Sequence, residues 1–141
     1  MTDDRIRDFL SELNACWPRG DLDALAAFYH PDVVLMPPDL GAPILGREAV
    51  VASYEEFLDA ATLERFDVTA LDTFSFTGAH DPGAVHMAHL TFEIHYRLDS
   101  ERYLEKGLEI YALMETAQGL RIVWRQQTVL DSRLAEKSET C

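Results

Sequence analysis

Apolar and polar residues alternate through the C-terminal part of the chain, from Ala84 to Leu130. Three such runs, AVHMAHLTFEIHYRL, YLEKGLEIYALME and LRIVWRQQTVL, are separated by short polar turns. Because successive side chains on a strand point to opposite faces of a sheet, each run predicts a half-buried β-strand.

The positions of the turns determine which residues share a face. Turns at Ser100–Glu101 and Ala117–Gln118 predict four cross-strand pairs: Leu90 with Tyr111, Phe92 with Glu109, Tyr111 with Trp124, and Glu109 with Gln126. One face would then carry Leu90, Phe92, Ile94, Glu109, Tyr111, Ile122, Trp124 and Gln126. An apolar surface with polar groups at its centre is typical of a ligand pocket. A slip of one residue in either turn would move half of this set to the other face.

Apolar residues in the N-terminal part recur at the three- and four-residue spacing of amphipathic helices. The first predicted helix runs from Asp3 to Trp17. A short second helix, capped by Asp21, should end near His30 because Pro31 follows. A third begins after Gly46, and its apolar face consists of Val50, Tyr54, Phe57, Leu58 and Ala61.

Two more strands are predicted, at Val33–Met36 and Phe66–Phe76, the second with a bulge at Asp72. Residues 39–46 contain two glycines and a proline and predict a loop. Periodicity ends after Asp131, so residues 132–141 are expected to form a flexible tail. Helices followed by antiparallel strands predict one α+β domain, residues 1–131, with its helices on one side of a curved sheet.

Composition narrows the class of partner. A chain of 141 residues can form one domain and bury about two-thirds of its unfolded surface without metal or disulfide. Its 25 acidic and 12 basic residues give a net charge of −13, which repels nucleic acid and anionic membranes, so neither is an expected partner. No stretch approaches the roughly 18 apolar residues of a membrane span, and no apolar run follows the start, Met-Thr-Asp-Asp-Arg. A soluble, cytoplasmic protein is expected.

Cysteine and histidine spacing argues against a metal site. Cys16 and Cys141 form no spaced framework and are expected to be free thiols. His86 and His89 would face opposite sides of a strand, and His95 shares the face of His89 at a distance of about 20 Å, at roughly 3.3 Å per residue. No HExxH-like motif supplies other ligands, so no metal is expected.

One stretch is specific enough to suggest a family. The segment GDLDALAAFYHPDVVLMPP, a Gly/Pro loop, GREAVVASYEEF and the WRQ of the last strand resemble the nuclear transport factor 2-like superfamily, in its ketosteroid isomerase and SnoaL-like branch. The resemblance covers about residues 5–131. It implies a cone-shaped curved antiparallel sheet wrapped by three N-terminal helices, with an interior pocket. It also implies frequent homodimers through the outer sheet face, and no cofactor in most members.

The catalytic residues of ketosteroid isomerases carry over poorly. The position of their general-base aspartate falls at Pro37, two residues before Asp39. Their helix-one tyrosine falls near Leu13, and their protonated pocket aspartate falls at Tyr111, whose phenol could still donate to a developing oxyanion. Steroid isomerisation by the known machinery is therefore not expected.

The candidate catalytic residues are Glu109, Tyr111 and Asp39. Glu109 is the most informative, because burial in an apolar cone would make it a usable acid or base; alternatively it faces water or pairs with a polar core group. Candidate ligand contacts are Trp17, Tyr54, Leu90, Phe92, Ile94, Trp124 and Gln126, for which ordinary core packing is the alternative.

Two functions remain open. The first is a cofactor-independent isomerase, cyclase or hydratase that acts by acid/base chemistry on a mainly apolar, oxygen-bearing substrate. The second is a non-catalytic ligand-binding or accessory domain. In either case the aliphatic row Leu108, Ile110, Ala112 and Met114 on the other sheet face predicts a homodimer interface.

Overall fold

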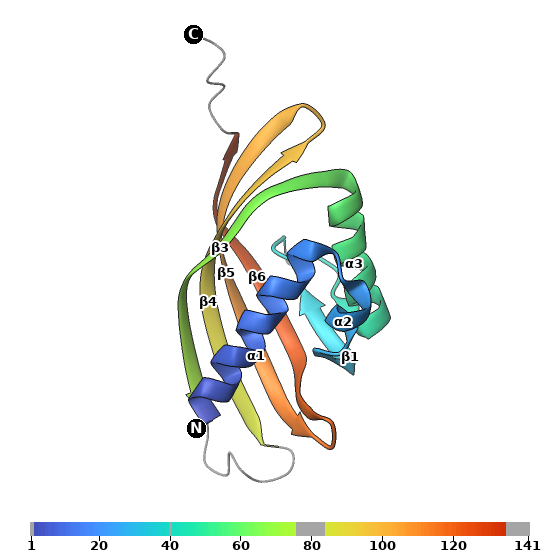
Figure 1. Cartoon of the computed structure of the whole chain (residues 1–141), viewed down its shortest axis with the longest axis vertical. Coiled ribbons are helices and arrows are strands. Elements are labelled where there is room, and N and C mark those ends of the chain that lie inside the picture. Colours follow the sequence, from blue (N-terminus) through green and yellow to red (C-terminus); the bar gives the residue numbers. More distant parts are fainter. Residues whose placement is uncertain (1, 40, 76–83, 135–141) are drawn as a thin grey trace.

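The structure, a computed structural model, describes residues 2–39, 41–75 and 84–134. Within these residues the helices are α1 (Thr2–Cys16), the 3-10 helix η1 (Trp17–Arg19), α2 (Leu22–Ala26) and α3 (Arg47–Ala60). The strands are β1 (Tyr29–Met36), β2 (Ile44–Leu45), β3 (Ala61–Ser75), β4 (Val85–Leu98), β5 (Glu101–Thr116) and β6 (Gly119–Leu134). They form one curved sheet, in the order β2-β1-β6-β5-β4-β3, with the helices on one side of it (Figure 1). The predicted α+β cone is confirmed.

The core lies between the helices and the concave face of the sheet. Ile6, Leu10 and Leu13, spaced by four and three residues along α1, are fully buried. This spacing places them on one side of the helix, so the stripe read from the sequence is the packed surface. Asp21 caps α2 as expected, accepting a hydrogen bond of 3.2 Å from the Ala24 backbone N–H.

The hairpin of β4 and β5 turns one residue earlier than predicted, at Asp99–Ser100. Asp99 has φ +58°, a left-handed conformation that aspartate tolerates better than most residues. The predicted pairs Leu90–Tyr111 and Phe92–Glu109 are therefore wrong, because Leu90 faces Glu109 and Phe92 faces Gly107. Since moving the turn by one residue changes the pairing by two positions, the inward residues of β4 and β5 stay inward.

The hairpin of β5 and β6 has the predicted turn but contains a bulge. Thr116 pairs with Gly119, and the ladder continues to Leu113 and Ile122. The next pair is Ala112 with Trp124, so Val123 is an extra residue in β6. An extra residue reverses the alternation beyond it. The predicted pairs with Trp124 and Gln126 are wrong: Tyr111 faces Arg125, and Glu109 faces Gln127.

The N-terminal strands are longer than the sequence suggested. Helix α2 ends at Ala26 and does not continue toward His30, because the Phe28 carbonyl accepts a bond of 2.9 Å from the Ile122 N–H of β6. Strand β1 thus begins at Tyr29 and runs parallel to β6, so the sheet is antiparallel except at this pair. A short strand, β2, lies within the predicted loop and pairs with β1.

Two other boundaries differ from the predictions. The register of β3 shifts between Leu63 and Arg65 and between Val68 and Ala70, and not at Asp72. Strand β6 continues to Leu134, three residues into the predicted tail, because it pairs with the start of β5. The predicted tail from residue 135 lies outside the described residues.

Candidate functional site

A pocket of about 340 Å³ opens between α3, η1 and the inner face of β4, β5 and β6. Its walls are mainly apolar and aromatic: Trp17, Leu35, Ile44, Phe57, Phe66, Phe92 and Ile94. Its polar lining residues are Ser53, Tyr54, Tyr96, Glu105, Glu109, Arg125, Gln127 and Thr128. Apolar walls with a few convergent polar groups are the usual composition of a small-molecule site.

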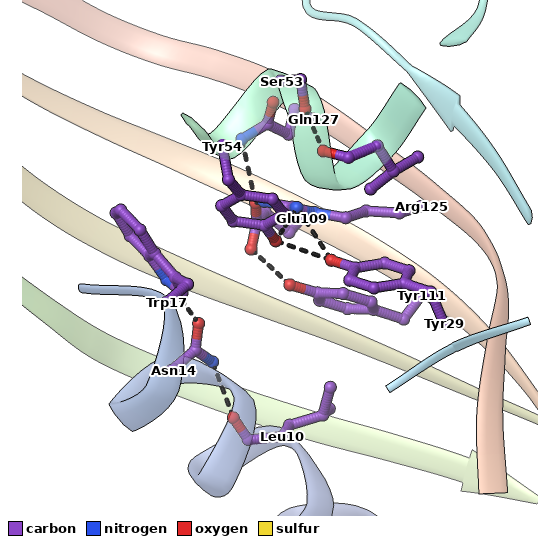
Figure 2. A network of polar contacts seen from close by, with 11 residues as sticks. Leu10, Asn14, Trp17, Tyr29, Ser53, Tyr54, Glu109, Tyr111, Arg125 and Gln127 are labelled. Carbon is purple, nitrogen blue, oxygen red and sulfur yellow. Dashed lines mark hydrogen bonds and ion pairs between the residues drawn. The ribbon is translucent and has the colours of Figure 1, made fainter. Parts of the chain in front are cut away.

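A buried ion pair forms the polar centre of the site. Glu109 and Arg125 are 2 % and 5 % exposed, and Arg125 Nη2 donates to Glu109 Oε2. The same carboxylate oxygen accepts from Gln127 Nε2 at 2.9 Å, and Oε1 accepts from the Tyr111 hydroxyl at 2.6 Å (Figure 2). All three partners are donors, so the site holds Glu109 as an ionised carboxylate.

The second terminal nitrogen of the Arg125 guanidinium donates to two phenols. Arg125 Nη1 donates to the hydroxyls of Tyr29, at 3.1 Å, and of Tyr54. These hydroxyls also bond to each other at 2.6 Å. The guanidinium lies 5.1 Å from the ring centre of Tyr54 and 5.7 Å from that of Tyr111, within reach of cation–π attraction. Side chains from β1, α3, β5 and β6 therefore meet at one cation (Figure 2).

Burial determines the protonation of these groups. It raises the pKa of Tyr29, and it raises the pKa values of Tyr54 and Tyr111 well above the ordinary 10.0. For Arg125 burial acts to lower the pKa, but Glu109 and the phenol oxygens outweigh it and the pKa is raised. At neutral pH the three phenols are protonated and the guanidinium is charged.

The pocket owes part of its width to a glycine. The Phe92 ring lies against Gly107 on the neighbouring strand, where a Cβ would overlap the ring edge and stand 3.0 Å from the Thr128 carbonyl oxygen. Phe92 stacks on Phe66, with ring centres 5.5 Å apart. Trp17 packs edge-on against Phe66 at 5.0 Å and completes this aromatic wall.

The candidate residues from the sequence are only partly brought together. Trp17, Tyr54, Phe92, Ile94 and Glu109 line the pocket. Leu90 and Tyr111 are buried on the inner face but are not part of the pocket lining, and Tyr111 uses its proton on Glu109. Trp124 and Gln126 face the other side of the sheet, paired with Ala112 and Ile110. Asp39 is exposed and accepts a bond of 2.8 Å from Gly41 N–H.

Three site residues, Arg125, Gln127 and Tyr29, do not stand out in the sequence pattern. Uninterrupted alternation from Trp124 and Gln126 places Arg125 and Gln127 on the outer face, and the bulge at Val123 reverses this. Tyr29 falls within the predicted second helix. One signal was present: a carboxylate expected inside an apolar cone requires a cationic or donor partner, and Arg125 was the nearest basic residue on the adjacent strand.

Metal ligands and membrane spans were searched for in residues 2–39, 41–75 and 84–134. No three His, Cys, Asp or Glu side chains there are grouped so that they could hold a metal ion. No helix in those ranges is long and apolar enough to cross a membrane.

The fold and the interior pocket define a cone-shaped domain of the nuclear transport factor 2-like type. More narrowly, the chain belongs to the SnoaL-like domain family, whose model matches residues 6–129. The resemblance inferred from the sequence motifs is thereby confirmed. A comparison with curated proteins finds no match.

Solved structures with this fold are similar over most of the chain. A ketosteroid isomerase-like protein from Erwinia carotovora atroseptica has TM-score 0.72 and 15% identity, covering 89% of this chain and 94% of that one. ActVI-ORFA from Streptomyces coelicolor has TM-score 0.70 and 14% identity, with coverage of 89% and 94%. The beta subunit of benzoate 1,2-dioxygenase from Burkholderia mallei has TM-score 0.67 and 15% identity, with coverage of 88% and 87%. At these identities the likeness concerns the fold alone.

Proposed function

We propose that this SnoaL-like domain binds a small, mainly apolar molecule that carries at least one oxygen. The observation that carries the proposal is the pocket itself, in which aromatic walls surround the Glu109–Arg125 centre. Apolar walls around a few convergent polar groups are the usual lining of a small-molecule site, which favours a mainly apolar ligand with an oxygen that matches those groups.

Ligand-dependent thermal stabilisation tests this proposal. A panel of ketones, alcohols and hydrocarbons of matched size should contain binders, and a binder raises the melting temperature by mass action. Val129→Trp should weaken binding, because Val129 lines the pocket and is 40% exposed, so that a larger ring there narrows the pocket. Leu130→Trp, at the neighbouring exposed position outside the pocket lining, is the control. Equal effects of both variants on the shift would place the binding elsewhere.

An enzymatic role would be a cofactor-independent isomerase, cyclase or hydratase reaction in this pocket. The ketosteroid isomerase-like neighbour is consistent with it. Glu109, held ionised by Arg125, would serve as an acceptor of protons and not as an acid. Mass spectrometry of each binder incubated with the protein measures conversion; binding retained but conversion lost in Glu109→Gln would support catalysis, and no conversion of any binder would oppose it.

A non-catalytic accessory role is the second candidate. The observation that favours it is the use of Glu109 and Tyr111 in internal hydrogen bonds, which occupies the groups expected to do chemistry. The similar beta subunit of benzoate 1,2-dioxygenase shows that the fold also occurs as a subunit of a larger enzyme. Binding without conversion is the result expected for this role.

We also propose that the outer sheet face pairs with a second copy of the chain. Phe74, Met87, His89, Leu108 and Ile110 surround a shallow apolar depression of about 260 Å³, and Phe74 is 49% exposed. Ile110→Glu would place an unpaired charge in such an interface and should convert a dimer to a monomer, measured by sedimentation. A wild-type monomer, or an unchanged mass for the folded variant, would contradict this proposal.

A further inference from the structure

The two phenols that contact Arg125 carry one more hydroxyl proton than their mutual hydrogen bond uses. Tyr29 and Tyr54 each carry one phenolic proton, and each oxygen accepts from Arg125 Nη1. A single hydrogen bond joins the two hydroxyls, so it uses one of the two protons. Among the described residues neither oxygen has a further acceptor partner, which leaves one proton without an acceptor.

Burial decides which tyrosine carries the surplus proton. Tyr29 is fully buried and is not part of the pocket lining, so a proton left on it would have no acceptor at all. Tyr54 lines the pocket. An unsatisfied buried donor is costly, so the favoured arrangement has Tyr29 donating to Tyr54. The Tyr54 proton is then the one not used within the network, on a residue that lines the pocket.

The pocket is also unsuited to an anion. Glu109 neutralises Arg125, and the remaining charged residue of the lining is Glu105, so the lined space carries a net negative charge. The chain as a whole has a charge of −13. An anionic ligand would lose hydration and gain no free cation, whereas a neutral acceptor would meet the Tyr54 proton.

We infer that Tyr54 is the ligand's hydrogen-bond donor, and that the pocket selects neutral carbonyl compounds over hydrocarbons and carboxylates of the same shape. This inference rests on the proposed binding function and names its ligand class. It moves the donor role from Tyr111, whose proton is used on Glu109, to a tyrosine on α3. Arg125, which donates to the Tyr54 oxygen, makes that phenol a stronger donor.

Calorimetric titration with four bicyclic probes of similar size tests the selectivity: 1-tetralone, 1-tetralol, tetralin and 1,2,3,4-tetrahydro-1-naphthoate. Wild-type protein should bind the ketone about tenfold more tightly than the hydrocarbon, and should bind the carboxylate most weakly. Tyr54→Phe should lose the ketone preference while its affinity for tetralin changes less than about twofold. Tyr103→Phe is the matched control, because Tyr103 is not part of the pocket lining and the preference should remain.

Infrared spectroscopy of bound 1-tetralone gives a second measurement on wild-type protein alone, which does not depend on the folding of any variant. The carbonyl stretch should move to lower wavenumber than in an apolar solvent, as expected for a hydrogen-bonded carbonyl. Binding of ketone and hydrocarbon with equal affinity, tight binding of the carboxylate, an unshifted carbonyl band, or an unchanged preference in Tyr54→Phe would each overturn the inference alone. If no neutral probe bound, the proposed binding function would fail together with it.

Discussion

Glu109 and Arg125 depend on each other. Each is almost fully buried, and each would be an uncompensated charge without the other. A buried ion pair adds little net stability compared with apolar residues of similar volume, but the loss of one partner is expensive. The pair therefore constrains the site more strongly than it stabilises the fold.

Removing one charge of this pair should cost more than removing both. Arg125→Met is expected to lower the free energy of unfolding by about 3 to 5 kcal/mol, because it leaves Glu109 buried and unpaired. The double variant Glu109→Gln, Arg125→Met should recover a large part of this loss. Urea denaturation of the four proteins of the cycle measures both values, and additive losses would show that the pair is not coupled.

Gly107 should control the width of the pocket. Gly107→Ala would place a methyl group against the Phe92 ring and the Thr128 carbonyl, so we expect a loss of about 1 to 3 kcal/mol and weaker ligand binding as the ring moves into the pocket. The smaller side chain in Gly107→Ala, Phe92→Leu should restore part of the binding. Equal affinity of wild type and Gly107→Ala in calorimetric titration would contradict this reading.

At the scale of single elements, the bulge in β6 has the largest consequence. Without the extra residue Val123, strict alternation would direct Trp124 and Gln126 inward and leave Arg125 outside. Glu109 would then be buried without its cation. One inserted residue thus decides whether the cone contains an ion pair or an unpaired carboxylate.

Neighbouring glutamines provide a test of this register. Gln127 donates to Glu109 at 2.9 Å, whereas Gln126 faces Ile110 on the outer side. Gln127→Leu should therefore lower stability by about 1 to 2 kcal/mol, through loss of a bond to a charged group. Gln126→Leu should change stability by less than about 0.5 kcal/mol. The reverse order in urea denaturation would show that the bulge is misplaced.

At the scale of the whole molecule, three buried phenols connect the N-terminal elements to the C-terminal strands. Tyr29, Tyr54 and Tyr111 come from β1, α3 and β5, and all three meet at the Glu109–Arg125 pair (Figure 2). Their raised pKa values mean that the folded protein holds three protons which the unfolded chain releases at high pH.

Stability should consequently fall as the solution becomes alkaline. A raised folded-state pKa contributes stability that is fully present below the unfolded value, here 10.0, and is lost as the pH rises above it. With three such groups the free energy of unfolding should fall by about 4 kcal/mol per pH unit.

Tyrosinate absorbance and circular dichroism, followed together from pH 9 upward, should show the buried phenols ionising with unfolding. Their ionisation in a folded protein would contradict this expectation. In Tyr29→Phe the slope should be about one third smaller.

Much of the fold could be predicted because its signals are local. The stripe of Ile6, Leu10 and Leu13 and the alternation in β4 each express one backbone period, which a sequence displays directly. The same reason explains why three pocket residues were predicted correctly, Glu109, Tyr54 and Phe92. Tyr54 lies on an uninterrupted helical repeat, and the predicted β4–β5 pairing was wrong by two positions, which leaves Glu109 and Phe92 on the inner face.

The composition of the site's polar centre was decided by tertiary structure. Whether β6 accommodates an extra residue at Val123 depends on its pairing with β5 and β1, which no local pattern in LRIVWRQ expresses. Tyr29 likewise belongs to a strand because the Phe28 carbonyl finds its donor at Ile122, far along the chain. The sequence alone determined the α+β cone, part of its apolar lining and the inward position of Glu109. Long-range pairing decided that Arg125, Gln127 and Tyr29 surround that carboxylate, because hydrogen bonds between distant strands outweigh the weak local preferences of a few residues.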